Sequence, residues 1–346
     1  MRKLLIAAHF LFFANQLFSQ AYFPIYKNDM WAYIDSNGTE VIAPKFDRAG
    51  YFYEGMALAI LNEKVGYINP KGEWAIPAKY DAAYNFSEGF AFILEDEDWG
   101  VVNKKGEWVI EPIYSKPGLF HNGLCKFKLE RGLFSTYGFI DAKGDTPIYP
   151  SYEKASDFCE GLAAVSKDGN KYGYIDTKGE WIIQPNYNLG VMMKIDGEYV
   201  LTDKNFSEGL VSFEKDNKIG VMDKTGKTVI EPTFAAIGKF KNGLAPAKTD
   251  SLYGYINTKG KWVINPQFNN AEMFNEGLAA VAIGPFMEEK WGFIDTKGKI
   301  VIPVTLAGGV SYTEPFLFKD GTATCYIEPG VWGYVNRTGK VIWKSK

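Results

Sequence analysis

The chain has 346 residues, with 38 basic and 41 acidic side chains and a formal net charge of −3. This balance argues against a surface that binds nucleic acid or an anionic membrane. With 46% hydrophobic and 23% charged residues, the composition is that of a folded globular protein, and 36 glycines with 16% aromatic residues indicate many short strands and tight turns.

The first twenty residues have the pattern of a secretory signal peptide. Two basic residues precede an apolar run, Leu4–Phe13, and a more polar stretch begins at Asn15. Because this run is shorter than the roughly 20 apolar residues of a transmembrane helix, we predict cleavage near residue 20 and no integral membrane association. No cysteine follows directly, so no lipid anchor is expected. The sequence therefore predicts a periplasmic or secreted protein with a signal peptide at 1–20 and a repeat domain at 21–346.

Nine tandem copies of one unit fill the repeat domain, and the commonest spacing is 34 residues. Helical repeats also have this period, so the content of the unit decides the fold. Each copy opens with a pair that is usually an aromatic or aliphatic residue followed by glycine. The nine pairs are Trp31-Ala32, Val65-Gly66, Trp99-Gly100, Tyr137-Gly138, Tyr172-Gly173, Ile219-Gly220, Tyr253-Gly254, Trp291-Gly292 and Trp332-Gly333.

Each copy predicts a β-hairpin and a third strand. Asp or Asn stands four residues after the start of the pair and glycine stands seven after it, as at Asp176 and Gly179. These residue types favour a tight turn between strands, and the mixture of Asp and Asn indicates hydrogen bonding to the backbone rather than charge or calcium binding. A proline follows, then an aromatic residue three positions before a second glycine, as at Phe158 and Gly161. The strand after it, Leu162–Val165, completes the unit.

Units of this size must stack on their neighbours, because one unit cannot bury a core alone. The chain enters the array on a lone third strand at 21–28 and stops after a hairpin at Trp343, so no split unit is left to join the two ends. We therefore predict an all-β tandem-repeat array of about nine three-stranded β-meanders. The preferred arrangement is an open β-solenoid or superhelix, and the alternative is a closed β-propeller-like ring.

The repeat resembles the WG-repeat family. Trp-Gly pairs begin at Trp99, Trp291 and Trp332, and the longer pattern Lys-Trp-Gly-Phe-Ile-Asp-Thr-Lys-Gly-Lys-Ile-Val-Ile-Pro spans 290–303. The resemblance covers the repeat domain almost end to end, with departures such as Ala32 at the first glycine. It implies a bacterial β-repeat protein, and it brings no catalytic or ligand-binding positions that could be carried over.

No grouping of side chains indicates catalysis, a metal or a cofactor. His121 is the only histidine after the signal peptide, which argues against a multi-histidine zinc site and a Ser-His-Asp triad. Cys125, Cys159 and Cys325 are too few and too scattered for a disulfide framework. Glutamates precede the second glycine in five copies, but Asn or Asp replaces them elsewhere, which indicates a turn role. We expect a protein that is not an enzyme and that needs no cofactor.

Tryptophan recurs at one position of the second strand, nine residues after the start of the pair. Trp74, Trp108, Trp181 and Trp262 occupy it and are the candidate binding residues. A row of half-exposed indoles would stack on sugar rings or on an extended peptide. Packing of each indole across the strands near the turn is the preferred alternative.

Copies five and eight are longer than the others, at Gly190–Lys204 and at Val304–Lys319. Extra length in a regular array maps to loops on one face, often the face that binds a partner. We expect an exported, non-enzymatic interaction scaffold at the bacterial cell envelope with a protein or peptide partner. The alternative is a glycan or cell-wall binding module that uses the four tryptophans, and no nucleic-acid partner is expected.

Overall fold

The computed structural model describes residues 21–114, 117–131, 134–189, 192–195, 198–201, 204–285, 288–308 and 316–345. The predicted signal peptide, residues 1–20, lies outside these ranges. Within them every regular element is a β-strand, paired strands run antiparallel, and no helix occurs. The all-β prediction is therefore confirmed.

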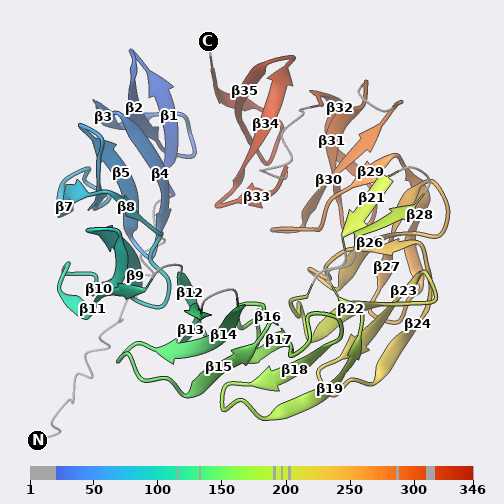
Figure 1. Ribbon diagram of the computed structural model, residues 1–346. Helices are drawn as coiled ribbons and strands as arrows, with labels where there is room; N and C mark the ends of the chain where they lie inside the picture. The colour runs from blue at the N-terminus through green and yellow to red at the C-terminus, as the bar shows by residue number, and fades with distance from the viewer. Residues whose placement is uncertain are drawn as a thin grey trace, which may run out of the picture.

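In the described part of the chain each repeat forms one small sheet, and we number these sheets 1 to 9 in chain order (Figure 1). The strands of sheets 1 to 5 are β1 (Phe23–Lys27), β2 (Met30–Ile34) and β3 (Glu40–Phe46); β4 (Arg48–Tyr53), β5 (Met56–Leu61), β6 (Lys64–Ile68) and β7 (Trp74–Tyr80); β8 (Ala82–Ala83), β9 (Phe90–Glu95), β10 (Asp98–Asn103) and β11 (Trp108–Tyr114); β12 (Pro117–His121), β13 (Leu124–Arg131), β14 (Phe134–Asp141) and β15 (Ile148–Tyr152); and β16 (Lys154–Ala155), β17 (Leu162–Ser166), β18 (Tyr172–Asp176) and β19 (Trp181–Tyr187).

A separate two-stranded hairpin, β20 (Met192–Ile195) with β21 (Glu198–Leu201), lies between sheets 5 and 6 in the chain. Sheets 8 and 9 are linked through the pairing of Ala307 with Tyr326. The strands of sheets 6 to 9 are β22 (Leu210–Lys215), β23 (Lys218–Asp223) and β24 (Thr228–Phe234); β25 (Ala236–Ile237), β26 (Leu244–Lys248), β27 (Tyr253–Asn257) and β28 (Trp262–Phe268); β29 (Asn270–Ala271), β30 (Leu278–Ile283), β31 (Lys290–Asp295) and β32 (Ile300–Ala307); and β33 (Phe318–Lys319), β34 (Thr322–Glu328), β35 (Val331–Asn336) and β36 (Val341–Lys344).

Seven of these nine sheets have four strands, which corrects the prediction of three-stranded units. The additional strand precedes the aromatic-x-x-Gly turn and is often only two residues long, as in β8, where Ala82 pairs with Leu94. A strand of two residues is too short to show a periodic pattern from which it could be recognised. The proline that follows the turn glycine lies inside the last strand of the sheet, as Pro77 does in β7. Proline fits there because this strand forms the edge of its sheet.

The predicted hairpin turns are present in all nine described copies. The Asp or Asn side chain accepts hydrogen bonds from the backbone N–H groups two and four residues later, as Asp141 does from Lys143 at 2.8 Å and Asp145 at 3.0 Å. Gly144 follows with φ +85°, a conformation that side chains disfavour. Asn69 makes the same bonds as the Asp residues, so the hydrogen-bonding interpretation is confirmed.

The glycine of the opening pair is required by a close approach of two strands. A Cβ added at Gly254 would lie 2.4 Å from the carbonyl oxygen of Ile264 in the next strand. The register shifts by a bulge at this place, between Tyr253 and Tyr255, and the shift brings the backbones together. The Trp-Gly glycine is therefore a packing residue.

Buried side chains gather between successive sheets, and the described residues form nine such clusters. Eight of them join each sheet to the next one in the chain; one example contains Tyr67 of sheet 2 and Phe86 of sheet 3. The ninth cluster joins sheet 9 to sheet 1 and contains Tyr334, Phe23 and Ile25. An open row of nine sheets would have eight such interfaces, so the two end sheets of this chain are in contact.

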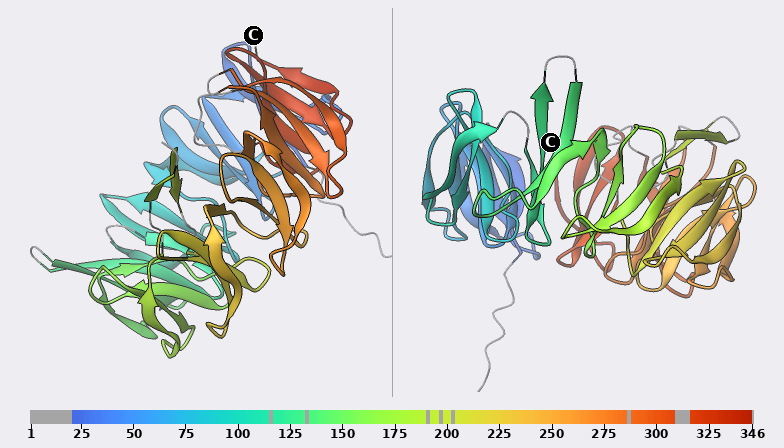
Figure 2. Two further views of the ribbon diagram at one scale, coloured as in Figure 1. Left: turned by 90° about the vertical axis from the view of Figure 1, so that its right-hand side faces the viewer. Right: turned by 60° about the horizontal axis from the view of Figure 1, so that its bottom comes forward.

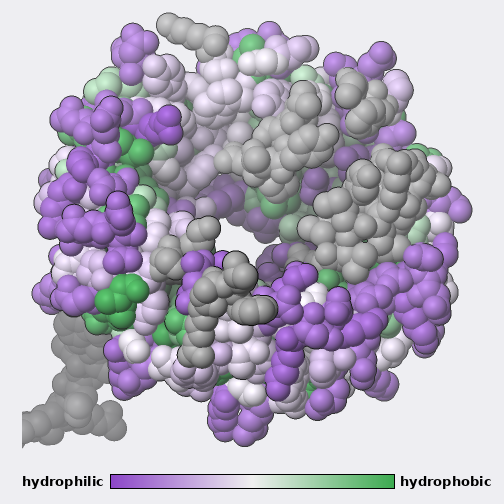
Figure 3. Space-filling view, in the orientation of Figure 1, coloured by the Kyte–Doolittle hydropathy of each residue, from purple (hydrophilic) through white to green (hydrophobic). Residues whose placement is uncertain are grey.

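The contact between sheets 9 and 1, which we call the seam, resembles the other junctions in one respect: the turn glycine lies against the last strand of the neighbouring sheet. A Cβ added at the turn glycine Gly106 would meet the Ile76 side chain of the preceding sheet at 3.3 Å, and one added at Gly38 would meet the carbonyl oxygen of Ile342 in sheet 9 at 2.5 Å. Figure 1 shows the sheets arranged in a circle with the first and last sheets side by side, and Figure 3 shows a central opening in the same orientation. The separated ends of an open solenoid, the arrangement that we preferred, are not found, and these contacts fit the ring that was the alternative.

The sheets stand with their turns on two opposite faces of the molecule. One face carries both the hairpin turns that begin at Asp35 and its equivalents and the turns of the Glu54-Gly55 type. The two kinds of turn are in contact there, because Lys104, in one of the hairpin turns, donates from Nζ to the Glu54 carbonyl oxygen at 2.9 Å. We call this face the turn face. Figure 2 shows the hairpins β13–β14 and β20–β21 projecting on the other side of the molecule, which we call the hairpin face.

Candidate interaction surface

The four candidate tryptophans lie at the junctions between sheets. Each indole is half-buried and packs edge-on against an aromatic ring at the end of the preceding sheet, with ring centroids 5.6 to 6.1 Å apart. The pairs are Trp74 with Phe46, Trp108 with Tyr80, Trp181 with Tyr152, and Trp262 with Phe234.

These indoles therefore act as wedges between neighbouring sheets rather than as contacts within one hairpin. A Cβ added at Gly100 would meet the Trp108 ring at 2.6 Å, so the indole also covers the glycine of its own sheet. The structure places one tryptophan at each of four separate junctions and does not bring the four together. Their use in binding a glycan or a peptide remains a prediction.

A second series of side chains connects the sheets, and the sequence analysis assigned it only a turn role. In each of sheets 2 to 9 the residue before the second glycine has φ between 50° and 55°. From sheet 2 to sheet 8, its side chain accepts hydrogen bonds of 2.6 to 3.2 Å from the backbone N–H groups of the same turn in the next sheet. We call this series the carboxylate ladder, and its members are Glu54, Glu88, Asn122, Glu160, Glu208, Asn242, Glu276 and Asp320.

The ladder explains why glutamate occupies a left-handed position that costs about 1 kcal/mol or more for an ordinary side chain. Only a longer acidic side chain reaches two N–H groups in the next turn, as Glu88 does to Asn122 and Gly123 at 2.7 Å each. Asn122 makes one such bond, to Gly161 at 2.9 Å. A periodic Glu-or-Asn position before glycine is the signal in the sequence, but only the packing of each sheet on the next places successive turns within reach.

Lysines reinforce two of the ladder positions. Lys104 Nζ lies 3.1 Å from a carboxylate oxygen of Glu54, and Lys224 Nζ lies at the same distance from Glu160. Burial by itself would raise the pKa of each carboxyl group, but the lysine and the backbone N–H donors outweigh it and hold both pKa values below the ordinary range. Both glutamates are thus charged and hydrogen-bonded near neutral pH.

The remaining candidates for chemistry do not come together. His121 ends β12 and is half-buried. Cys125 and Cys325 are buried, and burial raises the pKa of both thiols, which makes them poor nucleophiles. Cys159 is half-buried, with Sγ 3.1 Å from the Phe206 carbonyl oxygen. Among the residues with described positions, no three metal-ligating side chains form a group, and no helix is long and apolar enough to cross a membrane.

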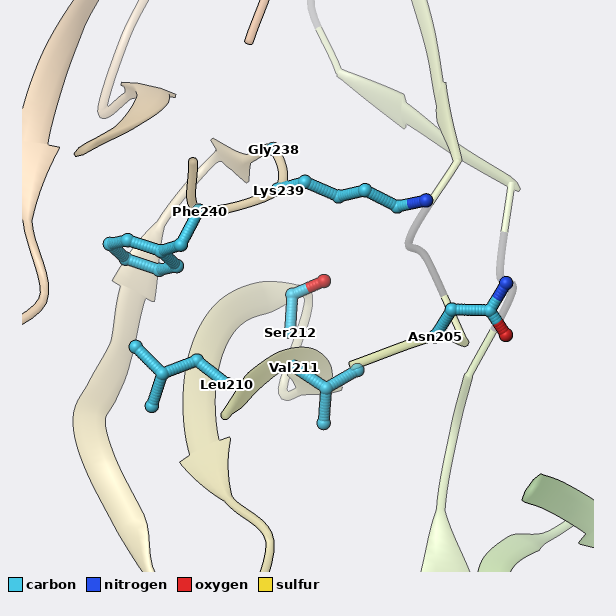
Figure 4. A pocket seen from close by; sticks show the side chains of 7 residues that line it. All are labelled: Asn205, Leu210, Val211, Ser212, Gly238, Lys239 and Phe240. Carbon is cyan, nitrogen blue, oxygen red and sulfur yellow. The ribbon is translucent and has the colours of Figure 1, made fainter. Parts of the chain in front are cut away.

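One small pocket lies beside β22, between Ser212 and the segment 238–240 (Figure 4). Its volume is about 10 Å³, which is room for a single water molecule. In the close-up view the Lys239 side chain extends toward Asn205. The pocket is too small for an organic ligand.

Three copies depart from the regular unit. In copy four, β13 and β14 pair beyond Leu129 and Thr136, and the last pair is Arg131 with Phe134; this extension was not singled out in the sequence. The enlargement predicted in copy five contains the hairpin β20–β21. In copy eight, residues 309–315 lie outside the described residues, so that part of the predicted enlargement is not placed.

The comparison with known proteins agrees with the repeat. A family model described as WG containing repeat matches residues 31–64, 66–97, 99–131, 137–170, 172–189, 219–253, 253–284 and 291–305, which is more than half of the chain. The ninth copy, around Trp332, forms sheet 9 although the model does not match it. The comparison with curated proteins gives no match.

Among solved structures, the chain is similar to BamB from Moraxella catarrhalis, with 10% identity over 85% of this chain and 94% of that chain and a TM-score of 0.43. It is similar to apo AztD from Citrobacter koseri, with 12% identity over 94% of each chain and a TM-score of 0.45. It also resembles dipeptidyl peptidase 4 from Porphyromonas gingivalis, with 11% identity over 81% of this chain and 57% of that chain and a TM-score of 0.51. At such identities the likeness concerns the fold alone. The repeat matches show that the chain belongs to the WG containing repeat family.

Proposed function

We propose that this protein is an exported, ring-shaped β-repeat scaffold without enzymatic activity, and that it binds a protein or peptide at the bacterial cell envelope. The signal-peptide pattern at 1–20 supports export. The contacts across the seam support the ring, in which sheet 9 packs on sheet 1 as each sheet packs on the next. In small-angle scattering such a ring gives the profile of a compact disc, whereas an open superhelix gives that of a longer particle.

The observation that carries the proposal is the position of the irregular additions. The hairpins β13–β14 and β20–β21 both project on the hairpin face (Figure 2), while the regular turns stay close to the ring. In β13–β14, no described residue beyond the pair Leu129 and Thr136 belongs to the nine clusters between the sheets, whereas Leu129 itself packs against the cluster of sheets 3 and 4. Extra length on one face of a repeat protein is where binding sites are commonly found.

The experiment shortens β13–β14 to the length of the other hairpins. In sheet 2 the pair Leu61 and Lys64 borders a two-residue turn, and Leu129 with Thr136 is the equivalent pair in sheet 4. Replacing the segment 130–135 by Asn-Gly therefore keeps the core of sheet 4, including Leu129, and supplies a favourable hairpin turn. Capture of an envelope protein by the natural chain, but not by this variant, is the expected result, provided that both unfold at a similar denaturant concentration.

The half-exposed indoles favour one other function, binding of a glycan. A matched variant with Trp74, Trp108, Trp181 and Trp262 changed to Phe keeps an aromatic ring at every junction. Capture of cell-wall glycan that is lost in this variant, while the shortened hairpin has no effect, would replace the protein partner by a glycan. Capture of neither class in parallel assays with purified glycans and envelope fractions would contradict both functions.

A further inference from the structure

One position on the turn face changes its charge halfway around the ring. It is the residue directly after the turn glycine, and its side chain is exposed in all nine sheets. Sheet 1 has an uncharged residue there, sheets 2 to 5 have an acid, and sheets 6 to 9 have a lysine. In chain order the residues are Thr39, Glu73, Glu107, Asp145, Glu180, Lys227, Lys261, Lys299 and Lys340.

The turn fixes the position of each of these side chains. The backbone N–H of every such residue donates to the Asp or Asn that opens its turn, as Lys261 does to Asn257 at 3.1 Å and Asp145 to Asp141 at 3.0 Å. Equivalent turns point to the same face, so the nine side chains follow the ring at regular intervals. Within the described ranges, none of the eight charged ones forms an ion pair. Glu73 and Glu107 accept hydrogen bonds from the Asn of their own turns, at 3.0 and 2.8 Å.

Neighbouring charges preserve the contrast between the two halves. Two residues before this position, sheets 2 to 5 also have a lysine, whose charge is balanced by the acid of the same turn. Sheets 7 and 8 have Lys259 and Lys297 there, which add to the positive charge of their turns. The carboxylate ladder contributes equally to both halves, because three of its acidic members lie in sheets 2 to 5 and three in sheets 6 to 9. One half of the turn face is therefore basic, and the other is neutral to acidic.

We propose that two copies of this chain associate face to face through their turn faces. The geometry follows from a two-fold axis that lies between the rings and passes through sheet 1 and the junction of sheets 5 and 6. This axis places sheet 5 opposite sheet 6 of the other copy, 4 opposite 7, 3 opposite 8 and 2 opposite 9. It therefore pairs Glu180 with Lys227, Asp145 with Lys261, Glu107 with Lys299 and Glu73 with Lys340, each twice in the dimer.

Sheet 1 lies on this axis and faces sheet 1 of the other copy. A charge at Thr39 would then meet its own copy, and the uncharged threonine avoids that repulsion. A closed two-fold dimer requires a surface that is complementary to itself, and the order of four acids, four lysines and one neutral residue meets this condition for one axis. The projecting hairpins lie on the hairpin face (Figure 2), so they do not keep the turn faces apart.

The inference goes beyond the proposed scaffold function and rests only on the ring arrangement. An external polyanion would need just the basic half, whereas a second copy accounts for both halves and for the neutral position. Exposed charge pairs are screened by salt, over a Debye length of about 10 Å at 0.1 M. We therefore expect sedimentation equilibrium of the natural chain to show a monomer–dimer equilibrium that shifts toward monomer as salt is raised from 20 to about 500 mM.

Charge reversal tests the pairing itself. The variant Lys261→Glu with Lys299→Glu places like charges opposite Asp145 and Glu107 in both copies, and we expect its dimer dissociation constant to rise about 100-fold. The variant Asp145→Lys with Glu107→Lys is expected to show the same loss. Mixed in equal amounts, the two variants should form a heterodimer, because every reversed charge then faces its opposite.

The matched control reverses two exposed lysines on the hairpin face, Lys215→Glu with Lys218→Glu, and is expected to leave the dimer intact. All substituted residues are exposed, and among them only Glu107 uses its side chain in its turn, where it accepts one hydrogen bond from Asn103. Each variant should therefore retain an unfolding midpoint close to the natural one. A natural chain that stays monomeric at low salt, with or without binding of an anionic polymer, would overturn the proposal. So would two reversed variants that fail to associate with each other while the natural chain dimerises.

Discussion

The junction between sheets 2 and 3 and the seam between sheets 9 and 1 bury similar cores but are held together differently. At the first, the Tyr67 hydroxyl donates to the Tyr84 carbonyl oxygen at 2.6 Å, and Glu54 joins the next turn through the ladder. At the seam, the Tyr334 hydroxyl donates to the Pro24 carbonyl oxygen at 2.9 Å. The described part of sheet 1 has no Glu-Gly turn, so no ladder bond crosses there.

Sheet 1 is also the smaller partner of the seam, because it has three strands where most sheets have four. Sheet 2 supplies part of the contact that the missing strand of sheet 1 would make. Its first strand, β4, has six residues, and the Tyr51 hydroxyl of this strand lies 3.2 Å from both Thr324 Oγ1 and the Tyr334 hydroxyl of sheet 9. Lys319 Nζ stacks over the Tyr53 ring at 4.1 Å. The seam is therefore held by noncovalent contacts alone, whereas every other junction is also crossed by the continuous chain.

The largest effect is expected from Tyr334→Ala, which removes a fully buried ring from the seam. Loss of such a ring costs about 3 to 5 kcal/mol of unfolding free energy, measured by urea denaturation. Tyr67→Ala, at the equivalent position of sheet 2, should cost a similar amount. Only the seam variant should also give a larger radius of gyration in small-angle scattering, because no chain crosses that junction.

Tyr334→Phe is the matched control, since it removes only the hydroxyl and its hydrogen bonds. Its cost should be about 1 kcal/mol, with an unchanged radius of gyration. Equal scattering profiles for Tyr334→Ala and Tyr67→Ala would show that the seam is no weaker than the other junctions.

The next effect concerns the tryptophans that lie between neighbouring sheets. Sheet 1 has no such tryptophan, because Glu40 occupies that position and forms an ion pair with Lys27 at 2.6 Å. Trp262→Ala removes a half-buried indole from its contact with Phe234 at 5.7 Å. We expect a loss of about 2 kcal/mol, below the range for a fully buried tryptophan. Trp262→Phe should recover most of this loss. An unchanged stability in the alanine variant would mean that the indole is available for a ligand.

Much of the repeat was predictable from local chemistry. Asp141 and Gly144 identify their hairpin turn because the turn needs a short acceptor side chain and a left-handed glycine. The position of the first and last sheets was not predictable in this way, because the contact between Tyr334 and Phe23 joins residues from opposite ends of the chain. The lone strand at the start suggested open ends, but side chains at the seam replace the missing strand.

The candidate surface was predictable only in part. The spacing identified Trp262 as a repeated position, but its partner Phe234 lies on the preceding sheet, and a single hairpin does not contain that contact. The ladder was hidden for the same reason, since the bonds of Glu88 reach residues 34 and 35 positions later. The change of charge at the residue after the turn glycine, in contrast, is visible in the sequence. It can be interpreted only once the structure shows that these turns share one face.

A smaller effect is expected from breaking one ladder position. Glu88→Ala removes the hydrogen bonds to Asn122 and Gly123 and leaves alanine in a left-handed conformation, so we expect a loss of about 1 to 2 kcal/mol. Glu88→Asn is the matched control, because asparagine tolerates this conformation and makes one ladder bond in the next sheet. Thermal unfolding of the two variants compares them directly. If the asparagine and alanine variants lose the same unfolding free energy, the ladder bonds contribute nothing measurable to stability.

The smallest expected effect is the response of the ladder to acid. The folded protein holds the pKa values of Glu54 and Glu160 below their ordinary value, which is about 4.3 in an unfolded chain. Both groups therefore stabilise the fold fully above that pH, and their contribution is lost as the pH falls through the lower, folded pKa. Because both side chains are about one-third exposed, we expect less than about 1 kcal/mol from each.

The double variant Glu54→Gln with Glu160→Gln separates these two groups from the other acids of the chain. At pH 7 it should be less stable than the natural protein, and the difference in unfolding free energy should shrink steadily between about pH 5 and pH 3. The seam has no ladder carboxylate, so Tyr334→Phe should show a constant difference over the same range. A difference that stays constant for the glutamine variant would mean that the two carboxylates act in the fold only through their shape.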